Sequence, residues 1–280
     1  MIDRRHFAGL AALSAFSALT TGSKATAQTA LPPGSRRAGL PPIFDPSGLR
    51  PEWRGAEEVL MLAYPGMTAL DLVAPQYMFA SLLGATVRVV ARDPGPIRSD
   101  TGLVIVPDLT FDAAPEAPDI LFAPGGISGT LAAMEDVATI DFLAARGARA
   151  GYVTSVCTGS LLLGQAGLLD GYEATSHWLA MPVLDAFGAT PVDARIVQDR
   201  NRLTGGGVTA GLDFGLTLVD LLRGEDYAKG VQLLAEYAPE PPFDAGRMET
   251  APPAVATRMT GLFPGFDDHA RALAEQRRGG

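Results

Sequence analysis

Residues 151–164 read Gly-Tyr-Val-Thr-Ser-Val-Cys-Thr-Gly-Ser-Leu-Leu-Leu-Gly. The first half is rich in β-branched residues and favours a strand, and the second half favours a helix that begins just after Cys157. A cysteine at such a strand-to-helix corner projects above the carboxyl edge of a sheet, where open α/β folds place their functional sites. The segment therefore predicts an α/β domain with a cysteine nucleophile elbow.

The central region repeats this alternation of short apolar runs with helical patterns, which is typical of a mostly parallel sheet covered by helices on both faces. The expected strands are 59–63, 86–91, 103–106, 120–123, 152–156, 195–198 and 202–204. The expected helices are 69–83, 129–134, 140–146, 159–166, 179–187, 210–222 and 228–236. We expect one three-layer α/β sandwich over residues 55–250, followed by one helix and a polar tail over residues 251–280.

The N-terminal 27 residues have the pattern of an export signal. Arg4-Arg5 precedes an uncharged stretch, and Ala25-Thr26-Ala27 has the small-x-small form of a cleavage site. The arginine pair favours a twin-arginine signal; the alternative is a buried N-terminal helix with a chance arginine pair. We expect a periplasmic or otherwise exported protein with no stable membrane insertion after cleavage. Residues 28–54, rich in Pro and Gly, predict an extension along the surface.

Charge and composition exclude several classes of partner. The 280 residues include 31 acidic and 22 basic side chains, a net charge of −9, which is the wrong sign for a nucleic-acid binder. One cysteine excludes an internal disulfide and a zinc site built on several thiolates. The carboxylates and histidines lack metal-ligand spacing, and neither a GxGxxG motif nor a P-loop lysine is present. We therefore expect no metal and no nucleotide cofactor.

The single cysteine is the first candidate for chemistry. The amide dipoles of a helix that begins after Cys157 favour the thiolate, and we expect them to lower the thiol pKa. The alternative is a buried structural cysteine, which is the commoner fate of a lone Cys. Position alone does not decide between the two.

Other candidates have equally plain structural explanations. Asp71 follows Thr68 at an expected helix start, where a cap residue and a first-turn acid are favourable in any protein. Glycines 125–126 and 205–207 follow strands, where they permit close backbone approach or merely tight turns. His177 lies 20 residues beyond Cys157 and is a candidate for the site wall. His269, near the polar tail, is expected on the surface.

Several segments resemble the ThiJ/PfpI superfamily, and within it they most resemble the isonitrile hydratases. The resemblance runs from about residue 59 to residue 253 and is carried by residues 69–75 (ALDLVAP), 123–126 (APGG), 153–171 (VTSVCTGSLLLGQAGLLDG), 174–178 (ATSHW), 203–214 (LTGGGVTAGLDF) and 236–243 (EYAPEPPF). It implies a flavodoxin-like fold of the class I glutamine amidotransferase type, no cofactor, and a homodimer.

The resemblance also implies roles for individual residues. Cys157 is expected as the nucleophile and Asp71 as its acid/base partner, with the Thr158 hydroxyl beside the thiol. The Val208 amide becomes a candidate donor to the sulfur, and the amides of Gly126 and Ile127 become candidates for anion stabilisation. His177 is kept as a further candidate for the site.

The implied reaction adds water to an isonitrile, giving an N-substituted formamide through a covalent cysteine thioimidate. One alternative is a solitary ligand-binding sensor of the kind that AraC-type regulators carry, although the chain after Glu236 is too short for their DNA-binding pair. Another is a thiol-dependent glyoxalase or deglycase acting on a different small electrophile. Protease-like relatives have His directly after Cys, and Thr158 in that place disfavours peptidase chemistry.

Overall fold

The computed structural model describes residues 46–279, so the export signal predicted over residues 1–27 lies outside the described residues. Contacts divide the chain into Met1–Gly48 and Leu49–Gly280. Of the first unit only the 3-10 turn η1 (Pro46–Gly48) is described. The second unit holds the whole fold that follows.

A seven-stranded sheet forms the middle layer, in the order β10-β11-β7-β6-β1-β2-β5. All neighbouring pairs are parallel except β10 and β11, which pair antiparallel. The strands are β1 (Glu58–Leu62), β2 (Thr86–Ala91), β5 (Leu109–Thr110), β6 (Ile120–Ala123), β7 (Tyr152–Val156), β10 (Ile196–Asp199) and β11 (Arg202–Gly205). The central strand β6 is buried along its length, as expected of a parallel sheet covered on both faces.

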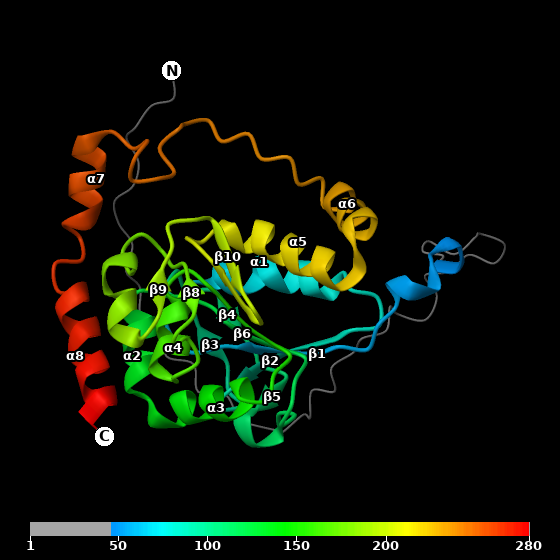
Figure 1. The fold of residues 1–280 in the computed structure, drawn as a ribbon, viewed down its shortest axis with the longest axis horizontal. Coiled ribbons are helices and arrows are strands. Elements are labelled where there is room, and N and C mark those ends of the chain that lie inside the picture. The colour runs from blue at the N-terminus through cyan, green and yellow to red at the C-terminus, as the bar shows by residue number, and fades with distance from the viewer. Residues whose placement is uncertain (1–45, 280) are drawn as a thin grey trace, which may run out of the picture. The chain divides into compact units, whose positions relative to one another are not determined.

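Helices cover both faces of this sheet (Figure 1). One layer contains α1 (Ala69–Ala80), α5 (Ala210–Arg223) and α6 (Glu225–Leu234). The other contains α2 (Ser128–Glu135), α3 (Val137–Gly147), α4 (Gly159–Gln165) and α8 (Phe266–Gly279). Under the first layer Phe79, Phe122 and Phe214 pack with ring centroids 5.7–5.9 Å apart, which joins α1 and α5 to β6. The predicted three-layer fold is therefore confirmed.

The structure corrects the sequence prediction at three elements. The helix expected over residues 179–187 is the 3-10 segment η4 (Met181–Phe187). The strand expected over residues 103–106 does not join the main sheet, because β4 (Val104–Ile105) pairs antiparallel with β3 (Ile97–Arg98). The expected polar tail folds as α8, which buries Phe266, Ala270, Leu273 and Ala274.

The remaining elements are short. They are η2 (Pro51–Trp53), η3 (Phe111–Ala113), the two-stranded pair β8 (Glu173–Ala174) and β9 (Thr190–Pro191), and α7 (Pro253–Thr260). Residues 49–54 lie against α5 and α6, since the Arg223 Nε donates to the Trp53 carbonyl at 2.9 Å and the Trp53 ring meets Tyr227 edge-on. Among the described residues no helix is long and apolar enough to cross a bilayer.

Candidate active site

Cys157 occupies the corner that the sequence predicted, directly after β7 and just before α4. Its φ of 60° lies in the left-handed region, a conformation that costs a non-glycine residue of the order of 1–3 kcal/mol. The Cys157 amide donates to the Gly206 carbonyl at 2.7 Å and to the Gly205 carbonyl at 3.1 Å. These bonds to the end of β11 hold the strained corner in place.

Two buried hydroxyls hold the carbonyl side of the same residue. The Ser176 hydroxyl donates to the Cys157 carbonyl at 2.9 Å, and the Ser160 hydroxyl lies 2.7 Å from Ser176 Oγ and 3.3 Å from that carbonyl. The backbone of the elbow is therefore fixed from both sides by groups that leave the sulfur free.

Asp71 stands in the first turn of α1 and is completely buried. Its Oδ2 accepts a hydrogen bond from the Gly125 amide at 3.1 Å, and the Thr68 amide donates to the Gly125 carbonyl at 2.8 Å. The turns after β1 and β6 are thus joined at one glycine. A side chain on Gly125 would lie 2.8 Å from Cys157 Cβ and 2.6 Å from the Thr158 amide nitrogen, so only glycine fits there.

The thiol and the carboxyl share this closed site. Burial raises the pKa of Asp71 to about 7, against smaller lowering effects from hydrogen bonds to Cys157 and to the Gly125 amide. Within the described residues Oδ1 of Asp71 has no partner with good hydrogen-bond geometry, although the thiol is close enough to affect the carboxyl. A carboxyl with this pKa can both accept and donate a proton near neutral pH.

The expected lowering of the thiol pKa is wrong for this closed site. Cys157 is 2% exposed, and burial together with the facing Asp71 charge raises the pKa of the thiol well above its usual range. The amide and hydroxyl of Thr158 oppose this rise but do not overcome it. Desolvation therefore outweighs the effect of the helix N-terminus, and the closed site favours the protonated thiol.

Thr158 is the centre of a chain of buried hydroxyls. Its Oγ1 accepts hydrogen bonds from the amides of Gly126 at 3.0 Å and Ile127 at 3.3 Å, and lies 2.7 Å from Thr130 Oγ1. Thr130 in turn lies 3.0 Å from the Tyr64 hydroxyl, which donates to the Pro124 carbonyl. The two amides predicted to stabilise an anion are thus occupied by Thr158, and their role toward a substrate stays a prediction.

The other predicted residues lie around this centre. Ile127 has φ 42°, which is strained for a β-branched residue, and its side chain lines a cavity together with His177. His177 is partly buried, and burial lowers its pKa to about 4, so its ring is uncharged at neutral pH. Val208 is partly buried and lies two residues before α5, but its amide is not among the groups that shift the thiol pKa.

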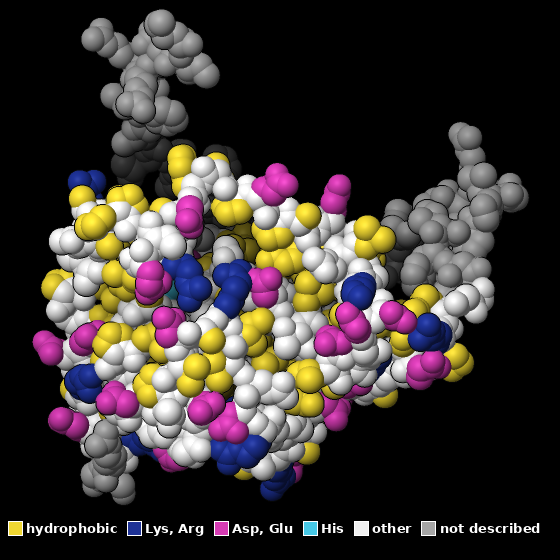
Figure 2. Space-filling view, turned by 45° about the horizontal axis from the view of Figure 1, so that its top comes forward, with side chains coloured by type: hydrophobic (Ala, Val, Ile, Leu, Met, Phe, Trp, Pro, Cys, Tyr) yellow, Lys and Arg dark blue, Asp and Glu magenta, His cyan; other side chains and the backbone are white. Residues whose placement is uncertain are grey.

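Two adjoining cavities of about 130 and 250 Å³ lie at this edge of the sheet and share Trp178, Arg247 and Met248. The smaller has a mixed polar and apolar lining that includes Ser176 and Gly206, both of which bond to the Cys157 backbone. The larger is apolar and includes Ile127 and His177. Figure 2 shows a hollow with hydrophobic side chains inside it and basic and acidic side chains at its rim.

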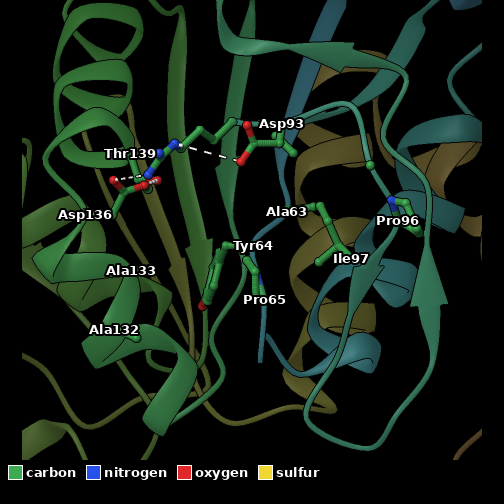
Figure 3. A pocket seen from close by; sticks show the side chains of 13 residues that line it. Ala63, Tyr64, Pro65, Asp93, Pro96, Ile97, Ala132, Ala133, Asp136 and Thr139 are labelled. Atoms are coloured by element: carbon green, nitrogen blue, oxygen red, sulfur yellow. Dashed lines mark hydrogen bonds and ion pairs between the residues drawn. The ribbon is translucent and has the colours of Figure 1, made fainter.

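A further cavity of about 360 Å³ lies beside the ends of β1 and β2 (Figure 3). Tyr64 and Ile97 line it, and Arg92 pairs with Asp93 and Asp136 across it. None of the site residues predicted from the sequence lines this cavity, and it meets the candidate site only through Tyr64, whose hydroxyl belongs to the chain around Thr158. Within the described residues no group of three or more His, Cys, Asp or Glu side chains could hold a metal ion.

Sequence reasoning missed the supporting hydroxyls of Tyr64, Thr130, Ser160 and Ser176. Ser160 and Ser176 lie inside the quoted motifs, so their position beside Cys157 was the available signal. Tyr64 and Thr130 meet only because β1 and β6 are neighbours in the sheet, which the sequence does not state.

Known proteins are similar to this chain over the same region. The chain is 49% identical to the isonitrile hydratase of Pseudomonas putida over 71% of this chain and 87% of that protein. It is 30% identical to the HTH-type transcriptional regulator GbdR of Pseudomonas aeruginosa, over 68% of this chain and 53% of the regulator.

Solved structures agree with the fold. A THiJ/PfpI family protein from Pseudomonas syringae superposes with a TM-score of 0.79 and 54% identity, covering 85% of this chain and 98% of that one. DJ-1beta of Drosophila melanogaster shares the fold, with 22% identity and a TM-score of 0.61. The match covers 66% of this chain and 100% of the DJ-1beta chain. The DJ-1/PfpI family profile matches residues 57–221, which is more than half of the sequence. With the elbow, the sheet order and this match in agreement, the chain belongs to the DJ-1/PfpI family.

Proposed function

We propose that this protein is an isonitrile hydratase, a lyase that adds water to R–N≡C and yields R–NH–CHO. The observation that carries the proposal is the closed pair of Cys157 and Asp71, in which the carboxyl pKa of about 7 suits proton transfer in both directions. Similarity to the hydratase of Pseudomonas putida over most of its length supports the same reaction.

In the first half of the reaction Asp71, as the carboxylate, takes the proton of the Cys157 thiol. The thiolate then attacks the terminal carbon of the isonitrile, and the carboxyl returns that proton to the same carbon. The product is a thioimidate, R–N=CH–S–Cys157, with Asp71 again ionised. Thr158 can turn its single hydroxyl hydrogen from Thr130 toward the sulfur as charge develops there.

In the second half Asp71 takes a proton from water, whose oxygen attacks the thioimidate carbon, and passes that proton to the nitrogen. The tetrahedral adduct collapses, the C–S bond breaks, and the hydroxyl proton returns to the pair as the formamide leaves. The sum is one water added, with no cofactor consumed.

The test is formamide formation from methyl and cyclohexyl isonitrile, followed by the formyl proton signal. Mass spectrometry of the quenched enzyme would locate the thioimidate on Cys157. Full turnover by a Cys157→Ala variant would overturn the mechanism, and no turnover by the wild type with either compound would overturn the function.

A ligand-binding sensor is the second candidate, because half of the regulator GbdR is similar to this chain. Tight binding of an isonitrile or another small molecule without turnover would favour it. A thiol-dependent reaction on small carbonyl compounds is the third, and methylglyoxal supplied to the same preparation separates it from the hydratase.

We also propose that the protein works as a homodimer. Leu70, Val73 and Tyr77 are 41–45% exposed along α1, beside the exposed Leu103 and Val104 of the β3–β4 ribbon. The ribbon and the start of α1 are in contact, since the Asp100 amide donates to the Met67 carbonyl. Light scattering should report a dimer that Val73→Glu converts to a monomer.

Export through a twin-arginine signal remains a separate proposal. The periplasmic form should begin at Gln28, as read by N-terminal sequencing, and Arg4→Lys with Arg5→Lys should keep the uncut chain in the cytoplasm. A periplasmic chain that retains Met1 would overturn it.

A further inference from the structure

The apolar cavity of about 250 Å³ is built by two distant parts of the chain. Ile127, His177 and Trp178 come from within the family region, residues 57–221. Val255, Met259 and Phe263 come from α7 and the turn after it, beyond that region. In Figure 1 the chain runs from α6 across the molecule to α7, which lies on the same side as α8.

Two walls of this cavity come from segments that flank the carboxyl end of β7, where Cys157 stands. The Ile127 amide, after β6, donates to Thr158 Oγ1, and the Thr158 hydroxyl and amide both affect the Cys157 sulfur. On the other flank, a Cβ on Gly207 would lie 3.1 Å from His177 Cδ2, which places the ring against the loop after β11. Since β7 lies between β6 and β11, the two walls stand on either side of the nucleophile.

The lining indicates an uncharged hydrocarbon ligand. Val255 and Met259 lie one turn apart on α7 and present the same face to the cavity. His177 is neutral at physiological pH because burial lowers its pKa to about 4. Among the described residues that line the cavity Arg247 is the charged one; it lies 3.7 Å from both Asp193 and Glu249, so its charge is balanced at the rim. An apolar cavity of about 150 Å³ holds benzene, so this one has room for a single ring or a branched alkyl group.

We propose that this cavity holds the side group R of the isonitrile, and that Val255 and Met259 set the size of R that the enzyme accepts. The inference rests on the proposed hydratase function. The preferred substrates are then isonitriles with a neutral cyclic or branched hydrocarbon group, whose reactive carbon is directed at Cys157 while the hydrocarbon lies against α7.

The kinetic test compares methyl, cyclohexyl and adamantyl isonitrile. Val255→Phe should lower kcat/KM for cyclohexyl isonitrile by about 10-fold or more and leave that for methyl isonitrile within about 3-fold, because a misfit of one or more carbon atoms in an apolar pocket has this effect. Met259→Ala should raise the ratio of adamantyl to cyclohexyl turnover. Leu262→Ala is the matched control, since Leu262 follows the same helix, is 59% exposed and does not line the cavity.

Binding without turnover gives an independent readout. In a Cys157→Ala, Trp53→Phe background Trp178 is the sole tryptophan and lines the cavity, so its fluorescence should respond to N-cyclohexylformamide. Val255→Phe should weaken that binding and Leu262→Ala should not.

The outcomes separate the two proposals. Unchanged selectivity in both α7 variants, with methyl isonitrile still hydrated, overturns the assignment of the cavity and leaves the hydratase intact. Hydration of no isonitrile, with a Trp178 response that Val255→Phe abolishes, overturns the hydratase function and supports the cavity as a hydrocarbon site. If no isonitrile is hydrated and Trp178 fluorescence does not respond, both proposals are overturned.

Discussion

The carboxyl of Asp71 and the thiol of Cys157 are buried together, so the protonation of each group alters the pKa of the other. Burial raises both values, and one proton can be shared between the two groups near neutral pH. The chemistry proposed for the site depends on this sharing.

Replacement of Asp71 by asparagine (Asp71→Asn) should therefore remove proton transfer while preserving shape. The oxygen of the introduced amide can still accept the Gly125 amide bond, but the side chain cannot carry the thiol proton. We expect kcat for isonitrile hydration to fall about 10²–10⁴-fold, the usual contribution of a positioned acid/base group. Steady-state formamide production measures this, and wild-type turnover in the variant would mean that another group moves the proton.

The pH dependence of kcat/KM should show one ionisation near pH 7, set by the pKa of Asp71. Below that value Asp71 is protonated and cannot accept the thiol proton, so activity should fall about tenfold per unit at lower pH and level off above about pH 8. His177, with a pKa of about 4, is neutral throughout this window and does not contribute. A profile that is flat between about pH 5 and pH 8 contradicts this assignment.

The same ionisation should appear in stability. Because the folded-state pKa of Asp71 is raised to about 7 from 3.8, the folded protein keeps a proton that the unfolded chain has lost between these values. The stabilising contribution is complete below about pH 4 and is lost as pH rises through about 7, at about 1.4 kcal/mol per pH unit. Denaturant unfolding gives the free energy of unfolding of wild type and of Asp71→Asn, and the wild-type value relative to the variant should be lower at about pH 7.5 than at about pH 5. A difference between the two proteins that is the same at both pH values would contradict this prediction.

Thr158→Val should destabilise the site more than Thr158→Ser. Valine leaves the amides of buried Gly126 and partly buried Ile127 without their acceptor, and each such loss costs about 1–3 kcal/mol. For a domain of this size each kcal/mol lowers the melting temperature by about 2–4 °C, so the drop should be at least about 4 °C, measured by thermal unfolding. Serine keeps the hydroxyl and lacks only the methyl group, so it serves as the control; equal losses in the two variants would contradict a special contribution of the hydroxyl.

The part of the fold that the sequence predicted well is the part with strong local signals. The ranges expected for β6 and β7 match the structure, and Cys157 lies at the predicted corner, because apolar β-rich runs with glycine-bounded ends are readable locally. Asp71 was placed at a helix start, and the sheet order then brings it to the thiol. Family resemblance, rather than spacing, was what linked those two residues.

What the sequence could not predict depends on tertiary contacts. Helix α8 has a highly charged sequence with small apolar residues such as Ala270 and Ala274, so its buried face is visible only against its neighbours. The raised thiol pKa required knowing how deeply Cys157 is buried, since a helix N-terminus alone argues for the opposite shift. The contact of α7 with residues 127–178 depends on the path of the chain between α6 and α7, which no local sequence pattern predicts.

The division of the larger cavity between residues 127–178 and residues 247–263 has a consequence for how such enzymes diversify. Cys157 and Asp71, the proposed nucleophile and acid, belong to the folded core, where most replacements are destabilising, whereas α7 is a largely exposed helix on which replacements are tolerated. If the cavity holds the substrate side group as proposed, new substrate preferences can arise through drift in this outer helix while the chemistry at Cys157 is retained, and libraries confined to these few positions are a compact starting point for directed evolution.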